Sequence, residues 1–342
     1  MKRTLLFFVC TLLCANVLFA QEQLAVLKHN DSTRVFYGAN AFVQAYNAAA
    51  NGDTITLSDG VFSVGTTINK NLTIRGNGAT PDTARRSSGT YFIDDFRFYS
   101  SNVNLNVEGV YFELVAYQQN DVFPSGKFTK CIFKKLYDID NSEFIDCIIE
   151  SGGIMNSNSN YSSYRTNTNN FTNCIINKSF FYKRSGSTLI EGGLPGFANC
   201  NNCILIGNDS TYTYCYNYTT FNNCIIINTS TDSILNRMTK NSILIGWNNA
   251  TGSYSTGNIS MEISDVFENW DGETISYDPE TYRLKSSVSD SIQGLDGSEV
   301  GIFGGFMPFD LRPSYSIIKR FNVANRTTAD GKLSVDIEVI SE

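Results

Sequence analysis

The sequence predicts an all-β solenoid, in which short strands and turns form coils that stack on one another. The main observation is a phrase of Phe-x-x-Cys followed by aliphatic residues. The phenylalanine of this phrase stands at positions 128, 144, 171, 197 and 221, at intervals of 16, 27, 26 and 24 residues. Repeats of this order are typical of solenoids, whose coils bury their inner faces by stacking on their neighbours.

Composition supports strands over helices. Asn, Ser, Thr and Tyr are abundant and Pro is rare, which favours short strands joined by asparagine-rich turns. An echo of the phrase without its cysteine, MTKNSILIG, begins at residue 238. Because no helical periodicity lies between the phrases, helical and leucine-rich repeats are disfavoured.

The first twenty residues have the form of a secretory signal peptide. Lys2 and Arg3 precede an apolar run, and Ala20 precedes a polar segment, so we expect removal of residues 1–20 and export to the periplasm, the cell surface or the medium. Cys14 raises the alternative of a lipoprotein, but the large Leu13 before it suits that processing poorly. No later stretch approaches the about twenty apolar residues of a membrane span.

Charge and cysteine content exclude several classes of partner. The formal net charge is -7 over 342 residues, which argues against nucleic acid as a partner. Beyond the signal, seven cysteines remain, an odd number that disfavours a disulfide framework. The only CxxC is Cys200–Cys203 and the only histidine is His29, so we expect no zinc site and no cofactor. A packed column of small apolar thiols is the favoured interpretation.

One helix is expected, near the start of the mature chain. Asn40 is a candidate N-cap for a helix over about 40–51, and Asn51-Gly52 provides its exit. Its apolar residues share one face: Phe42, Ala45, Tyr46 and Ala49. Short alternating strands separated by Gly and Asn turns are expected after it, through residue 78.

Two segments carry a resemblance to a known family. Residues 42–78, FVQAYNAAANGDTITLSDGVFSVGTTINKNLTIRGNG, resemble the opening of right-handed parallel β-helix proteins of the pectin-lyase-like superfamily. Residues 282–308, YRLKSSVSDSIQGLDGSEVGIFGGFMP, resemble the last coil of bacterial members of this group. The resemblance implies an N-terminal segment at 21–36 and a right-handed parallel β-helix over 37–308.

The last residues differ from the repeats. Residues 309–342 are expected to form a small C-terminal β appendage around a turn at Asp330-Gly331, because Val335, Ile337 and Val339 alternate with polar residues. We expect this appendage to cover the last coil, whose edge is otherwise open, or to dock elsewhere.

The superfamily includes lyases, hydrolases and esterases of acidic polysaccharides, but their phrases are missing. Hydrolases of this group share Asp-Asp and Gly-His-Gly phrases, but here Asp94-Asp95 is the only Asp-Asp pair and no Gly-His-Gly exists. Esterases of this fold need two aspartates, an arginine and glutamines on neighbouring coils, and Asp94, Asp95 and Arg97 contain only two of these residue types. A lyase needs a Lys or Arg base and calcium or arginine to neutralise a uronate carboxylate. The candidates are Lys134, Lys135, Asp138, Asp140, Arg165, Lys183 and Arg184. The alternative is that these are solvated charges on turns.

Two tyrosine-rich stretches are the candidate ligand-binding residues. Aromatic faces stack on the apolar side of sugar rings, and a strict alternation places side chains on one face of a strand. The candidates are Tyr161, Tyr164, Arg165, Tyr212, Tyr214, Tyr216 and Tyr218. The alternative is a ladder of stacked aromatic rings that closes a coil.

The paired aliphatics after each cysteine, such as Ile148-Ile149, raise a question of geometry. In a flat strand these neighbours point to opposite faces. Either the chain bends there so that both turn inward, since Asn173 and Asn223 before the cysteines tolerate left-handed geometry, or one aliphatic column is exposed and docks the appendage or a partner. The bend is favoured.

Two functions remain open at this point. The favoured one is an exported, non-catalytic protein that binds glycan or another surface partner along one lateral face. The alternative is a polysaccharide lyase that acts by β-elimination on uronate-containing polymers, with a Lys/Arg centre and calcium. Only this alternative implies a metal. Fold alone does not choose between them.

Overall fold

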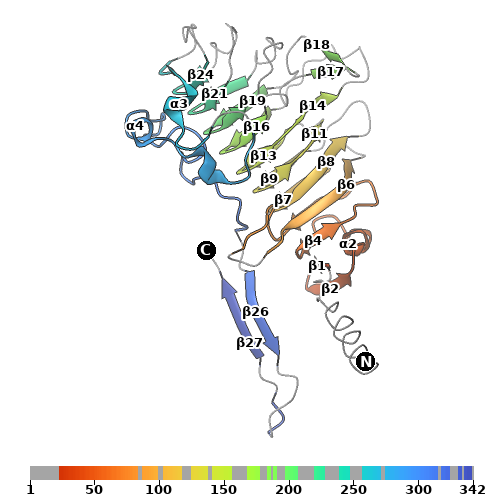
Figure 1. The fold of residues 1–342 in the computed structure, drawn as a ribbon. Coiled ribbons are helices and arrows are strands. Elements are labelled where there is room, and N and C mark those ends of the chain that lie inside the picture. Colours follow the sequence, from red (N-terminus) through yellow and green to blue (C-terminus); the bar gives the residue numbers. More distant parts are fainter. Residues whose placement is uncertain are drawn as a thin grey trace, which may run out of the picture.

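The computed structural model describes residues 23–340 with gaps. The residues outside the description are 1–22, 84–86, 99–102, 118–124, 138–140, 156–167, 178–182, 186–187, 191–196, 207–218, 228–238, 247–255, 271–273, 315–316, 324–329, 333–334 and 341–342. The described strands stack as coils into a parallel β-helix (Figure 1). The predicted fold class is therefore confirmed.

Sheet A is an 11-stranded sheet with the order β2-β1-β3-β5-β7-β9-β12-β15-β19-β21-β23. Each strand from β3 onward pairs in parallel with the strand of the next coil. Its strands are β1 (Leu24–His29), β2 (Ser32–Tyr37), β3 (Thr54–Leu57), β5 (Leu72–Arg75), β7 (Asn104–Glu108), β9 (Ser125–Thr129), β12 (Glu143–Ile145), β15 (Thr168–Thr172), β19 (Phe197–Asn201), β21 (Thr219–Asn222) and β23 (Thr239–Lys240).

Sheet B is a 14-stranded sheet that closes the other side of the coils. Its strands are parallel except for the β17–β18 hairpin. They are β4 (Gly60–Phe62), β6 (Thr90–Phe98), β8 (Tyr111–Tyr117), β10 (Ile132–Phe133), β11 (Leu136–Tyr137), β13 (Ile148–Ile149), β14 (Gly152–Met155), β16 (Ile175–Asn177), β17 (Lys183–Ser185), β18 (Thr188–Ile190), β20 (Ile204–Ile206), β22 (Ile225–Ile226), β24 (Ile243–Ile245) and β25 (Ile259–Met261).

The N-terminal end of the solenoid is capped by a hairpin and a helix. Strands β1 and β2 pair antiparallel, and β1 also pairs antiparallel with β3. Helix α2 (Ala41–Ala48) buries the predicted apolar face, including Phe42 and Tyr46. Asn40 is the N-cap residue, but its side chain makes no capping hydrogen bond, so that part of the prediction is wrong.

The repeated phrase forms stacked columns inside the solenoid. Phe128, Phe144 and Phe171 are in register on successive strands of sheet A, and their rings stack at centroid distances of 5.2 and 4.9 Å. In the next coil Cys200 occupies the phenylalanine position, while Phe197 pairs with Thr168. The coil phrase is therefore Cys200-x-x-Cys203, and the predicted start at Phe197 is out of register by three residues.

The cysteines form a buried column beside the phenylalanines, as predicted. Cys131, Cys147, Cys174, Cys203 and Cys224 are fully buried and carry free thiols. Each sulfur lies 3.4–3.7 Å from a backbone carbonyl oxygen of the preceding coil. Because burial raises the pKa of the Cys147 thiol, it stays protonated and unreactive in this apolar setting.

A left-handed corner precedes each cysteine of this column, and Ser242 in a later coil, and it separates sheet A from sheet B. The corner residues have φ between 47° and 56°: Lys130, Asp146, Asn173, Asn202, Asn223 and Asn241. Four are asparagine, the residue other than glycine that best tolerates this region. The predicted bend is confirmed, but it does not turn both aliphatics toward the lumen.

The two aliphatic residues of each pair bury on opposite sides of sheet B. Ile149, Ile176, Leu205 and Ile226 belong to the core inside the coils. The preceding residues form the outer isoleucine column, which is fully buried outside the coils: Ile132, Ile148, Ile175, Ile204, Ile225 and Ile243. This column was the docking strip of the alternative interpretation, and the structure shows what covers it.

Residues 263–313, here called the return segment, cover the outer isoleucine column. They contain α3 (Ile263–Val266), a 3₁₀ turn η3 (Pro279–Tyr282) and α4 (Ser286–Ser289). Apolar side chains of this segment pack in the same cluster as the column, among them Phe267, Tyr282 and Ile302. Burial of each isoleucine contributes roughly 1.5–3 kcal/mol.

The return segment runs back along the solenoid toward the early coils. Gly301 donates to the carbonyl of Asn223, and the Asn173 side chain donates to the carbonyl of Ile302. Further along, Lys130 Nζ lies 2.6 Å from the carbonyl oxygen of Arg312. Residues 282–308 therefore lie along the flank of sheet B, which differs from the last coil that their sequence suggested.

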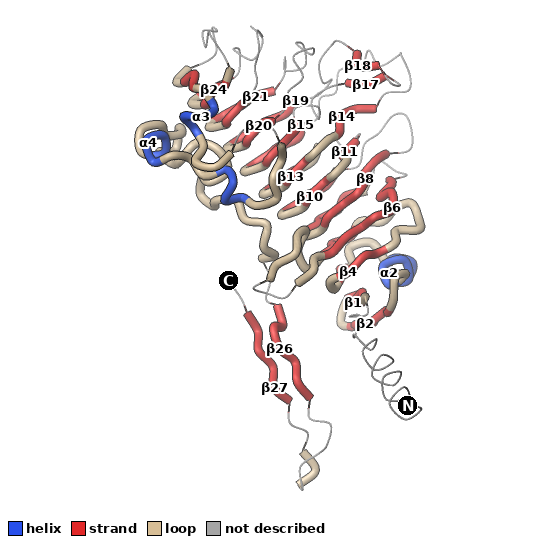
Figure 2. The backbone as a smooth tube through the Cα atoms, in the orientation of Figure 1, coloured by secondary structure: helices blue, strands red, loops and turns tan. Residues whose placement is uncertain are grey.

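The C-terminal hairpin consists of β26 (Ile317–Val323) and β27 (Val335–Ile340), paired antiparallel. Figure 2 shows it projecting away from the coils, so it does not cover the last described strands, β24 and β25. The predicted β appendage is present, and of its two expected roles only docking elsewhere remains.

Candidate functional site

The outer face of sheet A presents two rows of side chains that are polar except at Ile145, because inward and outward positions alternate along each strand. Inward residues such as Phe144 and Phe171 are buried, whereas their neighbours are at least partly exposed. The first row has one residue per coil in parallel register: Thr54, Thr73, Asn106, Lys127, Glu143, Asn170, Asn199 and Thr220. The second row runs beside it from Thr56 to Lys240.

Side chains within these rows bond to one another along the solenoid axis. Asn199 Nδ2 donates to Asn170 Oδ1 at 3.0 Å, and the Thr220 hydroxyl donates to Asn199 Oδ1 at 2.7 Å. In the second row Asn222 Nδ2 donates to Asn201 Oδ1 at 3.0 Å. These bonds hold the amides in one orientation, so the face is a preorganised array of donors and acceptors.

A shallow hollow lies on the same face. Its volume is about 300 Å³, and Lys127, Glu143 and Asn170 of the first row line it together with Asn104 and Thr168. Lys127 Nζ lies 3.0 Å from Glu143 Oε2, so the two charges offset each other. The hollow is thus polar with little net charge.

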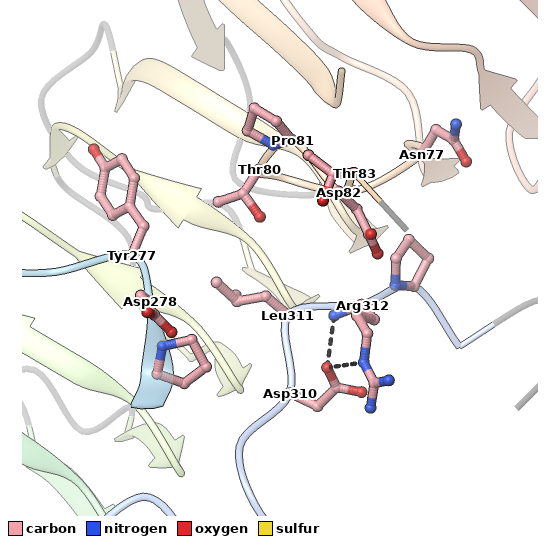
Figure 3. A pocket seen from close by; sticks show the side chains of 13 residues that line it. Asn77, Thr80, Pro81, Asp82, Thr83, Tyr277, Asp278, Asp310, Leu311 and Arg312 are labelled. Atoms are coloured by element: carbon pink, nitrogen blue, oxygen red, sulfur yellow. Dashed lines mark hydrogen bonds and ion pairs between the residues drawn. The ribbon is translucent and has the colours of Figure 1, made fainter. Parts of the chain in front are cut away.

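A larger cleft, of about 720 Å³, lies where the return segment meets an early loop. Residues 77–83 form one wall, and residues 277–279 and 310–313 form the rest. Figure 3 shows Tyr277 and Asp278 facing Thr80 and Pro81 across this opening, with Asp310 and Arg312 at its lower edge. Segments about 200 positions apart in the chain therefore build one site.

Charges at the edge of the cleft are held in fixed positions. Arg312 donates through Nε and its backbone amide to Asp310 Oδ1, both at 2.9 Å. Lys130 Nζ lies 3.6 Å from the other oxygen of Asp310. Because the Lys130 side chain is only 7% exposed, this cation lies behind the wall and is not presented to a ligand.

Lys134 and Lys135 are the predicted catalytic residues whose side chains are described, and Lys135 is exposed. Lys134 is the more enclosed of the two. Its Nζ lies 2.7 Å from Glu113 Oε1, and Glu150 stands at the matching position of the next coil. The hydrogen bond and ion pair with Glu113 raise the pKa of Lys134. A lysine held in its charged form cannot accept a proton, so this environment does not suit a general base.

The other predicted site residues are not brought into a described site. Lys183 and Arg184 begin strand β17, where they pair in register with Ile154 and Met155. This strand is two strands away from β11, which follows Lys134. The remaining candidates lie outside the described residues, between described strands: Asp138, Asp140, Tyr161, Tyr164, Arg165, Tyr212, Tyr214, Tyr216 and Tyr218.

The described part of the chain holds no group of three or more His, Cys, Asp or Glu side chains arranged to bind a metal ion. Within the same residues, no helix has the length and apolarity needed to cross a membrane. Comparison of the chain with protein-family models, curated proteins and solved structures gave no match.

Sequence reasoning missed both described surfaces for different reasons. The polar rows could have been found, because the residues that flank the core phenylalanines Phe171 and Phe221, such as Asn170, Thr172 and Asn222, are hydroxyl or amide residues. The cleft carried no local signal. Thr80 and Tyr277 are brought together only by the backward course of the return segment.

Proposed function

We propose that the protein is an exported member of the pectin-lyase-like superfamily that binds a glycan polymer without cleaving it. The proposed binding surface is the outer face of sheet A. The observation that carries this proposal is the register of its first row, which repeats a hydroxyl, amide or paired charge in every coil from Thr54 to Thr220.

A repeating surface suits a repeating ligand. Neighbouring strands lie about 4.8 Å apart, so the row offers hydrogen-bonding groups at regular short intervals along the solenoid axis. An extended polysaccharide presents its hydroxyl groups at regular intervals as well. Many modest contacts of this kind add up through effective concentration along one chain.

The charge of the first row favours a neutral polymer. Lys127 and Glu143 pair within the first row, and Asn170, Asn199 and Thr220 beyond them carry no charge. A lyase for uronates would need cations facing its substrate. Lys134, the more enclosed of the described candidates for this role, is instead neutralised by Glu113 and stays protonated. These observations support binding over β-elimination.

The test is retention of the mature chain on insoluble polysaccharides and on a glycan array. The double variant Asn170→Ala/Asn199→Ala should lower retention at least tenfold, because it removes the two bonded amides of the row. The control is Asn47→Ala, an exposed asparagine on α2. Equal retention of both variants would move the site away from sheet A. Release of unsaturated uronate ends, followed by ultraviolet absorbance, would instead establish the lyase.

A further inference from the structure

The cleft between the early loop and the return segment is preformed, because hydrogen bonds within the protein hold each of its walls. The Tyr277 hydroxyl donates to Glu150 of sheet B, which fixes one wall. On the opposite wall, Asn77 Nδ2 donates to Asp59 Oδ1 at 2.7 Å. The third lining segment, residues 310–313, is held by two hydrogen bonds: Lys130 Nζ donates to the carbonyl oxygen of Arg312, and the Ser314 amide donates to Glu108 at 2.7 Å. Rigid walls lower the entropic cost of binding.

The lining combines apolar surfaces with oxygen acceptors. Three prolines, Leu311 and the Tyr277 ring supply the apolar part, and Tyr277 is 40% exposed. Asp82, Asp278 and Asp310 supply carboxylates, and among the described residues of the lining Arg312 is the basic one. Sugars match such a surface, since their C–H faces pack on aromatic rings and their hydroxyls donate to carboxylates.

Burial and the hydrogen bond to Glu150 raise the pKa of Tyr277, so its hydroxyl stays protonated at neutral pH. The proton is used in the bond to Glu150, which leaves the ring face as the part available to a ligand. Tyr277 therefore contributes a fixed aromatic platform to the cleft.

We propose that this cleft is a second, separate carbohydrate site that binds short non-acidic oligosaccharides, such as the end of a neutral glycan chain. The inference rests on the proposed glycan binding but uses different residues from the sheet A surface. Its volume of about 720 Å³ lies within the range of small-molecule sites, roughly 300–1,000 Å³. Among the described residues of the lining, three carboxylates stand against one guanidinium, so we expect uronate oligosaccharides to bind more weakly than neutral ones.

Calorimetric titration of the mature chain tests this site with defined probes. The probes are neutral tetrasaccharides of glucose, xylose, mannose and N-acetylglucosamine, with tetragalacturonate and a tetralysine peptide as charged counterparts. We expect at least one neutral tetrasaccharide to bind. Tyr277→Ala and Thr83→Trp should each weaken it at least tenfold, the first by removing the platform and the second by filling the opening from an exposed position.

Two matched controls separate recognition from folding. Tyr277→Phe keeps the ring and should bind within about threefold of the parent chain, and Tyr37→Ala removes a tyrosine that is 57% exposed on β2 and should have no effect. The proposal is overturned if no neutral tetrasaccharide binds, if only tetralysine or tetragalacturonate binds, or if Thr83→Trp binds normally. Polymer retention through sheet A is scored separately, because Asn170→Ala/Asn199→Ala should leave tetrasaccharide binding unchanged.

Discussion

Lys130 Nζ lies 2.6 Å from the carbonyl oxygen of Arg312, a residue 182 positions later in the chain. The bond ties the end of the return segment to the corner of an early coil. The same Nζ lies 3.6 Å from Asp310 Oδ2. One buried cation therefore holds both a backbone acceptor and a carboxylate of the segment that covers the outer isoleucine column.

Removal of this cation should loosen the return segment. Lys130→Met keeps the side-chain length but leaves Arg312 O without its donor and Asp310 Oδ2 without its nearby cation, which should lower the urea unfolding free energy by about 2–4 kcal/mol. Lys127→Met is the matched control, because Lys127 is exposed and pairs with exposed Glu143; it should cost at most about 1 kcal/mol. Equal losses of unfolding free energy in the two variants would show that Lys130 does not hold the return segment.

Asp146 should make stability fall as pH rises. It occupies a left-handed corner where four other coils have asparagine, and one of its buried oxygens has no hydrogen-bond partner. Burial raises its pKa from 3.8 to about 8. The folded chain thus keeps a proton that the unfolded chain has released, so the stability is fully present below pH about 4 and is lost by pH about 8.

The slope in this range is up to about 1.4 kcal/mol per pH unit from this one group. Asp146→Asn removes the titration and keeps a residue that suits the corner, so the variant should gain stability over the parent chain at pH 8. Urea unfolding at pH 5 and pH 8 measures the difference. If the variant and the parent chain lose stability equally between these values, Asp146 is not the group responsible.

The coils could be predicted from the sequence because their signal is local and repeated. Phe144, Cys147 and Ile149 stand in one short phrase, and stacking such phrases buries all three. The same phrase also indicated the corner at Asn173 and Asn223, which has the expected left-handed geometry. The predicted register is wrong in the coil where Cys200 occupies the phenylalanine position, because Phe197, three residues earlier, looks like the start of the phrase.

The parts that could not be predicted depend on contacts between distant residues. A buried pair such as Ile148-Ile149 shows that both sides of a strand are covered, but not by what. Within the cover, residues 263–313, the sequence predicts that residues 282–308 form the last coil, because their phrases resemble one. Bonds between distant residues, such as those from Asn173 and Lys130, show that the cover runs backward, and the cleft beside Tyr277 follows from that course.

The outer isoleucine column should behave as core. Ile175→Ala should lower the unfolding free energy by about 2–4 kcal/mol, because the return segment encloses this side chain and a cavity would remain. Ile145→Ala is the control, since Ile145 lies half-exposed on the outer face of sheet A; its cost should stay below about 1 kcal/mol. Similar small losses at both positions in urea unfolding would show that the return segment does not cover the column.

The cysteine column should tolerate serine better than a disulfide or a metal site would. Cys174 Sγ lies 3.3 Å from the carbonyl oxygen of Thr172, and in a later coil Ser242 makes the equivalent bond to Lys240 O at 2.9 Å. A serine at 174 can therefore bond the same acceptor, and Cys174→Ser should cost only about 1 kcal/mol in urea unfolding. Loss of a structural disulfide would cost about 2–5 kcal/mol. The reciprocal Ser242→Cys should fold with little change, because the column accepts either side chain. A large loss in Cys174→Ser, together with loss of a bound metal by mass spectrometry, would show that the thiols are ligands and not a packed column.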